Sequence, residues 1–519
     1  MMDMNFDLLG QSARQLPSNL ICSSVRVGAV RWRRLAEELS GSGGRFLTLW
    51  GTDDRDRDGR FRIYAVYLLP ECRVAVVEHE MESGSHPVYP SLAELFPSAS
   101  RMERAMYDLL GIASTEPDKR GWLRHGGWPE TVFPLRRDIS GAQQYPLVSE
   151  PYPFLQVDGD GVHEIAVGPV HAGTIEPGHF RFSVVGEKVL RLEERLGYKH
   201  KGIAKRFEQM RQGQAHRLAS RVSGDSAVAF SWAYCAALEA ITQAACTSRA
   251  ANLRALALEH ERLANHLGDL GALGNDAGFA FGLTHFSRLK EDLLRTNASV
   301  FGARYLLDYI VPGGVATDLE DHAPDRLLIR YETLEKEVAV LCSIYDEHAG
   351  IQDRFRDAGR VKPELAEKLG AIGLVGRASG VLSDLRVDHP WPPYDKLKPK
   401  LVTQPSGDVA ARVQVRFDDI AESIRLCRAL LKDMFPGPIR TDIPVAEPDR
   451  IGLGLIEGWR GPVIIALETG PHGAIRRCHA HDPSWQNWPI LEYAILGNIV
   501  PDFPLINKSF NLSYSGQDG

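Results

Sequence analysis

The sequence contains no closely spaced pair of cysteines. Its seven cysteines stand at positions 22, 72, 235, 246, 342, 427 and 478, so the nearest two are eleven residues apart. Zinc, iron–sulfur and nickel sites built on thiolates need C-x-x-C pairs or similar local clusters, and the chain offers none. An odd number of scattered cysteines is typical of reduced thiols in a cytosolic protein.

Long hydrophobic runs are also missing. The longest apolar stretches, such as residues 461–470, fall well short of the roughly 20 residues that span a bilayer. The N-terminal residues include acidic side chains and show no basic-then-apolar order, so they do not resemble a secretory signal. We therefore expect a cytoplasmic protein, or one that only its partners hold at a membrane.

The chain has neither an excess of positive charge nor a dinucleotide-binding motif. Lys and Arg number 60 against 67 Asp and Glu, which gives a formal net charge of −7. This balance does not favour nucleic acid or an anionic membrane as a partner. No G-x-G-x-x-G follows a predicted strand, so direct binding of NAD is not expected.

The first 139 residues predict a compact α/β unit. β-branched and aromatic residues dominate three runs that predict strands, at 45–52, 60–69 and 73–81. Helical spacing follows at 91–96 and 100–112. Pro, Gly and Ser are then concentrated at 140–162, which we interpret as a linker.

Beyond the linker the pattern becomes mainly helical. Residues 164–200 predict a small antiparallel sheet. A 3.6-residue periodicity predicts a helical bundle from about 202 to 350 and further helices over 360–440. Strands return at 451–470 and 473–483. The predicted fold class is α+β: a small α/β domain, then a mainly helical domain with small peripheral sheets.

Several motifs resemble one superfamily, in the same order along the chain. ERAMYDLLGI at Glu103–Ile112 and FPLRRD at Phe133–Asp138 resemble the C subunit of complex I. GPVHAGTIEPGHFRF at Gly168–Phe182 and GYKHKGIAK at Gly197–Lys205 resemble two related proteins. These are the D subunit of complex I and the large subunit of formate-hydrogenlyase-type nickel–iron hydrogenases.

Further motifs continue this order: LEHERLANHLGDLG, FGARYLLDYIVPGGV, GRASGVLSDLRVDHPWPPYDKL, DPSWQNWP and GNIVPDFPLINKSF. The resemblance implies a fused chain, with a C-like domain at 1–139, a linker at 140–162 and a D-like, hydrogenase-large-subunit-like domain at 163–519. One small departure is Ala204, which replaces the usual glutamate of the H-R-G-x-E-K turn.

The largest departure concerns the four nickel-ligand positions. In hydrogenases of this kind two C-x-x-C pairs hold the nickel, but the matching positions here are Ser223, Ser226, Ser484 and Asn487. A neutral hydroxyl or amide is a poor substitute for a thiolate at redox-active nickel. We expect no metal on this chain, and the resemblance implies a vacated cofactor cleft that Asp225 and His481 also line. From the residues alone, the 223–226 segment also predicts a cap for the apolar helix that follows.

The opening hairpin carries a second departure. His171 matches the first of two histidines in complex I, whereas Ile175 occupies the position of the histidine that donates to the quinone headgroup. Glu176 matches a glutamate of hydrogenase-like members thought to pass protons. The resemblance therefore implies a proton route through His171 and Glu176, with quinone a possible ligand of the cleft.

Charged residues in two later segments have two interpretations each. Arg377, Asp384 and Arg386 match a segment that lines the deep cavity in this superfamily, yet such residues also form exposed salt-bridge loops. Another set shares one helix face: Glu259, Arg262, His266 and Asp269. This second stripe is either a solvated surface or a buried charge network that carries protons.

Two further segments are rich in histidine or in basic residues. On a strand, His479 and His481 would share one face, and Cys478 would lie on the other. This arrangement does not favour a metal site.

Residues 195–221 carry eight Lys and Arg but only two aromatic side chains, which does not favour nucleic acid as a partner. We interpret this segment as a docking face for an iron–sulfur protein.

These observations predict a peripheral-arm subunit of an energy-converting membrane complex. By resemblance, a small iron–sulfur protein like the B subunit of complex I would supply a 4Fe-4S cluster. The cleft would pass electrons to quinone or another small acceptor, coupled to antiporter-like membrane-arm subunits. The alternative is a non-catalytic scaffold with a vacated active site. The missing thiolates exclude a working nickel hydrogenase.

Overall fold

The computed structural model describes residues 9–10, 12–82, 84, 87–149 and 151–519. Its N-terminal domain is built on one sheet, with strand order β1-β2-β5-β4-β3. The strands are β1 (Arg14–Gln15), β2 (Ile21–Val27), β3 (Arg45–Asp54), β4 (Arg60–Leu69) and β5 (Arg73–Glu82). β2 and β5 run parallel, and the other pairs are antiparallel. The three predicted strands are therefore confirmed as β3, β4 and β5.

Helices of this domain cover the sheet. The elements are α2 (Ala29–Gly41), α3 (Arg55–Asp58), α4 (Ala99–Leu110), β6 (Val88–Tyr89) and β7 (Ala113–Ser114). α2 buries Trp32, Leu35 and Leu39, the apolar spacing that a packed helix requires. The helix predicted at 91–96 is wrong: this segment is a turn, because side chains of Ser91 and Glu103 bind its backbone N–H groups.

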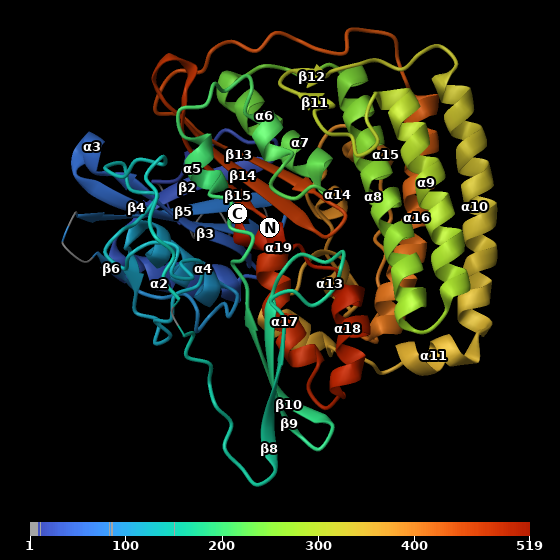
Figure 1. Ribbon diagram of the computed structural model, residues 1–519. Helices are drawn as coiled ribbons and strands as arrows, with labels where there is room; N and C mark the ends of the chain where they lie inside the picture. The colour runs from blue at the N-terminus through green and yellow to red at the C-terminus, as the bar shows by residue number, and fades with distance from the viewer. Residues whose placement is uncertain (1–8, 11, 83, 85–86, 150) are drawn as a thin grey trace.

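The second domain begins with a three-stranded antiparallel sheet that projects from the body (Figure 1). Its strands are β8 (Val162–Val167), β9 (His179–Val185) and β10 (Lys188–Arg195). The predicted small sheet is thus confirmed. The loop between β8 and β9 carries His171 and Glu176 back toward the centre of the molecule. The proposed boundaries at 139 and 163 stay a prediction.

Long helices form the bundle at one side of the molecule (Figure 1). They are α8 (Ser248–Asp276), α9 (Ala280–Phe301), α10 (Ala323–Glu347) and α16 (Val409–Lys432). Shorter elements connect them: α11 (Ala349–Phe355), α12 (Pro363–Leu369), α13 (Gly373–Arg377), α14 (Leu385–Asp388), α15 (Tyr394–Leu397), β11 (Ile310–Val311) and β12 (Gly314–Val315). Among the described residues, no helix combines the length and hydrophobicity needed to cross a bilayer.

A central sheet, β13-β14-β15, joins the two domains. Its strands are β13 (Ile451–Glu457), β14 (Pro462–Thr469) and β15 (Ile475–His481). On one side lies α7 (Ala227–Thr242), so close that a Cβ on Gly454 would lie 1.8 Å from the Ala233 carbonyl oxygen. On the other side Trp50 of β3 stacks on His479, with ring centroids 4.9 Å apart.

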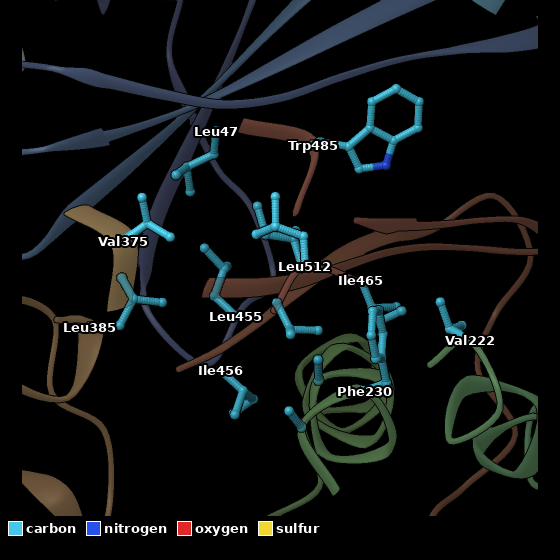
Figure 2. Close-up of a cluster of buried hydrophobic side chains, with 14 of the residues drawn as sticks. Leu47, Val222, Phe230, Val375, Leu385, Leu455, Ile456, Ile465, Trp485 and Leu512 are labelled. Carbon is cyan, nitrogen blue, oxygen red and sulfur yellow. The ribbon is translucent and has the colours of Figure 1, made fainter. Parts of the chain in front are cut away.

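The core of the molecule lies where these elements meet. Figure 2 shows Leu47 of β3, Phe230 of α7 and Leu455 of β13 in one hydrophobic cluster with Leu512, which follows much later in the chain. The remaining helices are α5 (Ile203–Phe207), α6 (His216–Ala219), α17 (Ser484–Ala494), α18 (Phe503–Phe510) and α19 (Tyr514–Asp518). The α+β fold class is confirmed, and its two domains share a continuous core.

Candidate functional site

Three of the predicted cleft residues lie in the loop before α7. The Ser223 hydroxyl donates to Asp225 Oδ1 at 2.7 Å, and its oxygen is 2.8 Å from Ser513 Oγ. Ser226 stands at the N-terminus of α7 but makes no capping bond with its side chain. The predicted cap is therefore wrong: Glu261 of α8 accepts the Val228 and Ala229 N–H groups instead.

Arg460 holds this loop in place. Its guanidinium binds both carboxylate oxygens of Asp225 and reaches Ser226 Oγ at 3.3 Å. Burial alone would raise the pKa of Asp225, but the charge and hydrogen bonds of Arg460 outweigh it and lower this pKa to about 2. Asp225 is therefore a fixed negative charge, and Arg460 neutralises it.

The second pair of positions lies at the start of α17. Ser484 Oγ accepts the Ser513 N–H at 2.8 Å. The Asn487 side-chain amide donates to the Ile372 carbonyl at 3.1 Å and accepts the Ile372 N–H at 3.3 Å. It therefore bonds to the Ile372 backbone in the way that a neighbouring β-strand would. Both side chains are at most 1% exposed. Their polar atoms are thus used to join parts of the protein.

Segment 511–519 fills the space between these two pairs of positions. Ser513 contacts Ser223 and Ser484, and its hydroxyl caps α19 by accepting the Gly516 N–H at 2.8 Å. A Cβ on Gly516 would lie 2.4 Å from Asp482 Oδ2, so only glycine fits this close approach. The four positions supply hydroxyl and amide groups that bind the chain itself, and this donor set does not fit nickel.

The same segment reaches the opening hairpin. Tyr514 Oη lies 3.3 Å from His171 Nε2, and the Ser515 N–H donates to Glu176 Oε2 at 2.9 Å. Lys199 Nζ is 3.8 Å from the other oxygen of Glu176. His171 and Glu176 are thus brought together with the Ser223 and Ser484 regions, as the sequence predicted, but segment 511–519 lies between them.

The helix stripe of α8 is buried, so its interpretation as a solvated surface is wrong. We use the name buried charge network for a set of nine residues: Glu259, Arg262, His266, Asp269, Arg377, Asp384, Arg386, Arg416 and Asp419. All of them are at most 3% exposed. Opposite charges alternate within the set, which is how a protein interior tolerates this many ions.

Arg386 is one centre of the buried charge network. It donates to both oxygens of Asp384, at 3.0 and 2.7 Å, and to Glu259 at 3.1 Å. Tyr394 and Ser423 also donate to Glu259, at 2.6 and 2.7 Å. Arg386 and Asp384 therefore form an internal network and no exposed loop.

Arg377 occupies a second centre. It binds Asp419 through two bonds of 2.9 and 2.7 Å, and His266 Nε2 lies 3.2 Å from the same carboxylate. Burial lowers the pKa of His266, so its imidazole is neutral near pH 7. The terminal nitrogens of Arg377 are thus paired within the protein, and its predicted place in the lining of a deep cavity stays a prediction.

Asn511 connects the buried charge network to the four positions. Arg460 Nε donates to the Asn511 carbonyl at 2.6 Å, and the Asn511 amide donates to Asp269 at 2.6 Å. Asp269 in turn accepts from Arg416 at 2.9 Å. An unbroken chain of hydrogen bonds therefore runs from Asp225 into the helical bundle.

Glu457 is a carboxyl group of this region that is suited to hold a proton. Its Oε2 accepts the Leu385 N–H at 3.1 Å, but Oε1 has no partner among the described residues. Burial and the nearby charge of Asp384 raise the pKa of Glu457 to about 8. No motif in the sequence pointed to Glu457, Arg460 or Asn511. The available signal was the presence of charged residues, Glu457 and Arg460, inside the apolar strand pair 451–470.

His481 bonds to Gln486, with its Nε2 3.0 Å from Gln486 Oε1. It shares a strand face with His479, as predicted, with ring centroids 6.3 Å apart, and Cys478 is buried on the opposite face. No set of three or more His, Cys, Asp or Glu in the described part of the chain has metal-binding geometry.

Comparison with known families fits the two-part fold. Residues 25–145 match the family of the respiratory-chain NADH dehydrogenase 30 Kd subunit, and residues 276–451 match that of the 49 Kd subunit. Formate hydrogenlyase subunit 5 of Escherichia coli is 31% identical over 485 residues, covering 92% of this chain and 85% of the relative. The chain belongs to this family of fused C/D-type subunits.

Other relatives in the family divide between hydrogenases and complex I. Hydrogenase-4 component G of E. coli is 29% identical, covering 91% of this chain and 83% of the relative. The fused C/D chain of the NADH-quinone oxidoreductase of Phocaeicola vulgatus is 27% identical, covering 76% and 80%. A chain in the structure of the archaeal membrane-bound sulfane sulfur reductase shares the fold, with a TM-score of 0.65 and 22% identity over 69% of this chain and 99% of that one.

Proposed function

We propose that this chain is a peripheral-arm subunit of a membrane-bound, energy-converting complex, hydrogenase-related or NADH:quinone oxidoreductase-like. Membership of the fused C/D family supports this role. In this proposal a small iron–sulfur protein, similar to the B subunit of complex I, docks at 195–221 and holds a 4Fe-4S cluster. Antiporter-like subunits form the membrane arm, and they hold this chain at the cytoplasmic face of the inner membrane.

The series of hydrogen bonds that passes through Asn511 is the main support for this proposal. Electron transfer drives ion movement only if a change of charge near the cluster alters protonation or pairing elsewhere. Asp225, Arg460, Asn511 and Asp269 provide a continuous polar path for such a response. Glu457, with its raised pKa, can take up or release a proton beside the buried charge network.

The electron acceptor in this proposal is quinone or another small molecule. His171, Glu176, Ser223 and Ser484 all contact segment 511–519. Binding of an acceptor between them therefore requires α19 to move aside. Ile175 still stands where complex I carries its quinone-donating histidine, so a proton for the acceptor would come from Glu176 or His171.

The test uses the intact complex in sealed membrane vesicles. We expect reduction of the cluster to drive quinone reduction and ion uptake. Asn511→Gly keeps the positive φ of 44° at this position but removes the amide that binds Asp269. It should therefore preserve quinone reduction and lower the number of ions moved per electron several-fold. Asn275→Gly, at an exposed end of α8, is the matched control and should change neither quantity.

A second candidate function is a non-catalytic scaffold that transmits conformational change between soluble and membrane subunits. The filled space between the four positions favours it, because Ser513 uses both Ser223 and Ser484 as structural partners. If the intact complex reduces no quinone or other small acceptor, while Asn511→Gly still impairs ion movement, the scaffold function replaces the first proposal.

A further inference from the structure

A cavity of about 90 Å³ lies between the N-terminal domain and the end of the second domain. β3 and α4 contribute one side of it, and β15 and α19 the other. Its walls are mostly apolar and include Leu49, Met102, Met106, Leu135 and Trp485. An engineered cavity of about 150 Å³ takes up benzene, so this one suits a molecule of only a few heavy atoms.

Arg477 lines this cavity and has no carboxylate partner. Its side chain is 6% exposed, and its guanidinium donates to two backbone carbonyls, those of Cys478 at 3.0 Å and Gly51 at 3.5 Å. Among the described residues no carboxylate forms an ion pair with it within 4.0 Å. A buried, unpaired guanidinium is costly, because it loses hydration without gaining a counter-charge.

Two acidic groups close to this region, Glu208 and the cavity-lining Asp518, bind other cations or donors. Glu208 is paired with Lys205 at 2.9 Å and with Arg137 at 3.3 Å. Asp518 accepts the backbone N–H groups of Gly197 and Lys199. Glu208 acts on the charge of Arg477 without forming an ion pair, and burial outweighs it, so that the pKa of Arg477 is lowered.

The other basic groups on this face of β15 add no charge. Burial lowers the pKa of His481 to about 3 and holds that of His479 well below its ordinary value. Both imidazoles are therefore neutral near pH 7. The positive charge of the cavity comes from Arg477, since a guanidinium stays protonated.

Gln517 supplies a second unmatched polar group. It is fully buried, it lines the same cavity, and neither its Nε2 nor its Oε1 has a hydrogen-bond partner in the described part of the chain. Buried amides are nearly always paired, so a group that is left unpaired beside a cavity points to a ligand.

We propose that this cavity binds a small monovalent anion with the shape of a carboxylate. The Arg477 guanidinium would pair with its two oxygens, as arginine does with carboxylates. The Gln517 amide would donate a further bond, and the apolar walls would receive a tail of one or two carbon atoms. This site is separate from the four positions and does not depend on the proposed electron transfer.

Calorimetric titration of the full chain with acetate tests the site, at constant ionic strength set by a bulky sulfonate. Acetamide is the matched neutral probe. We expect saturable acetate binding and at least tenfold weaker binding of acetamide. Arg477→Met should weaken acetate binding at least tenfold, whereas Arg217→Met, at an exposed position, should leave it unchanged.

The stability of Arg477→Met without ligand provides an independent measurement. Because the buried guanidinium has no carboxylate partner among the described residues and only two bonds to backbone carbonyls, its removal should leave the melting temperature equal or raise it. Equal affinity for acetate and acetamide, undiminished acetate binding by Arg477→Met, or no saturable acetate binding would each overturn the proposal. A melting temperature that falls by several degrees would also overturn it, since Arg477 would then be a structural side chain.

Discussion

Replacing Arg386 by Met tests the buried charge network directly. Arg386 pairs with Asp384 and Glu259, and all three side chains are at most 2% exposed. Met keeps most of the volume, so the main effect is that buried Asp384 loses its bound cation, while Glu259 keeps only Arg262 as a cation among the described residues, at 3.3 Å. Removing one partner of a buried ion pair costs about 3–5 kcal/mol of folding free energy. We expect a loss of this size at pH 7.

The loss should depend on pH with a definite sign. In the natural protein, burial would raise the pKa of Asp384, but Arg386 outweighs it and lowers this pKa to about 2. Its contribution to stability is therefore present above the unfolded pKa, about 4, and is lost only as the pH falls toward 2. Without Arg386 the folded pKa rises above the unfolded value. The variant should then be least destabilised near pH 5 and increasingly destabilised as the pH rises to 7.

Urea unfolding at pH 5, 6 and 7, followed by circular dichroism, measures both effects. Arg34→Met is the matched control, because Arg34 forms an exposed i,i+4 pair with Glu38 that should contribute less than about 1 kcal/mol. A loss for Arg386→Met no larger than that of the control would refute the reasoning. So would a loss that does not grow between pH 5 and 7.

Three further outcomes are expected. Gly516→Ala should destabilise the protein by about 1–3 kcal/mol in the same unfolding assay, since its Cβ would lie 2.4 Å from Asp482 Oδ2. Gly173 has open space around it, so the control variant Gly173→Ala should change the stability little. The raised pKa of Glu457, about 8, contributes a loss of stability as the pH rises from about 4.5 to 8. Glu457→Gln should reduce this slope, and an unchanged slope would contradict the assignment. Elemental analysis of protein purified from nickel-supplemented cells should find far less than one nickel per chain, and a stoichiometric amount would disprove the account of the four positions.

The sequence predicted the elements whose signals are local. The strands at 45–52, 60–69 and 73–81 follow from dense β-branched and aromatic runs, and the strand face shared by His479 and His481 follows from period-2 geometry. The family motifs placed Ser223 and Ser484 in one region, and the structure brings both to Ser513.

The contacts that the sequence did not predict are long-range ones. Ser223 and Ser513 are 290 residues apart. The small polar residues of 511–519 have no periodic pattern that predicts a buried helix. The capping of α7 by Glu261 could not be predicted for the same reason. Glu261 supplies it from the neighbouring helix, so tertiary packing replaced the local bonds that Ser226 would have made.

The position of Ser513 has a consequence for synthesis of the chain. At about 5–20 residues per second, the ribosome adds the 290 residues between Ser223 and Ser513 in about 15–60 s. During this interval Ser223 and Glu176 have polar groups whose partners in 511–519 do not yet exist, beside an apolar core that is already emerging. The interior of the nascent second domain is therefore incomplete until residues 511–519 are made, and docking of this segment completes it.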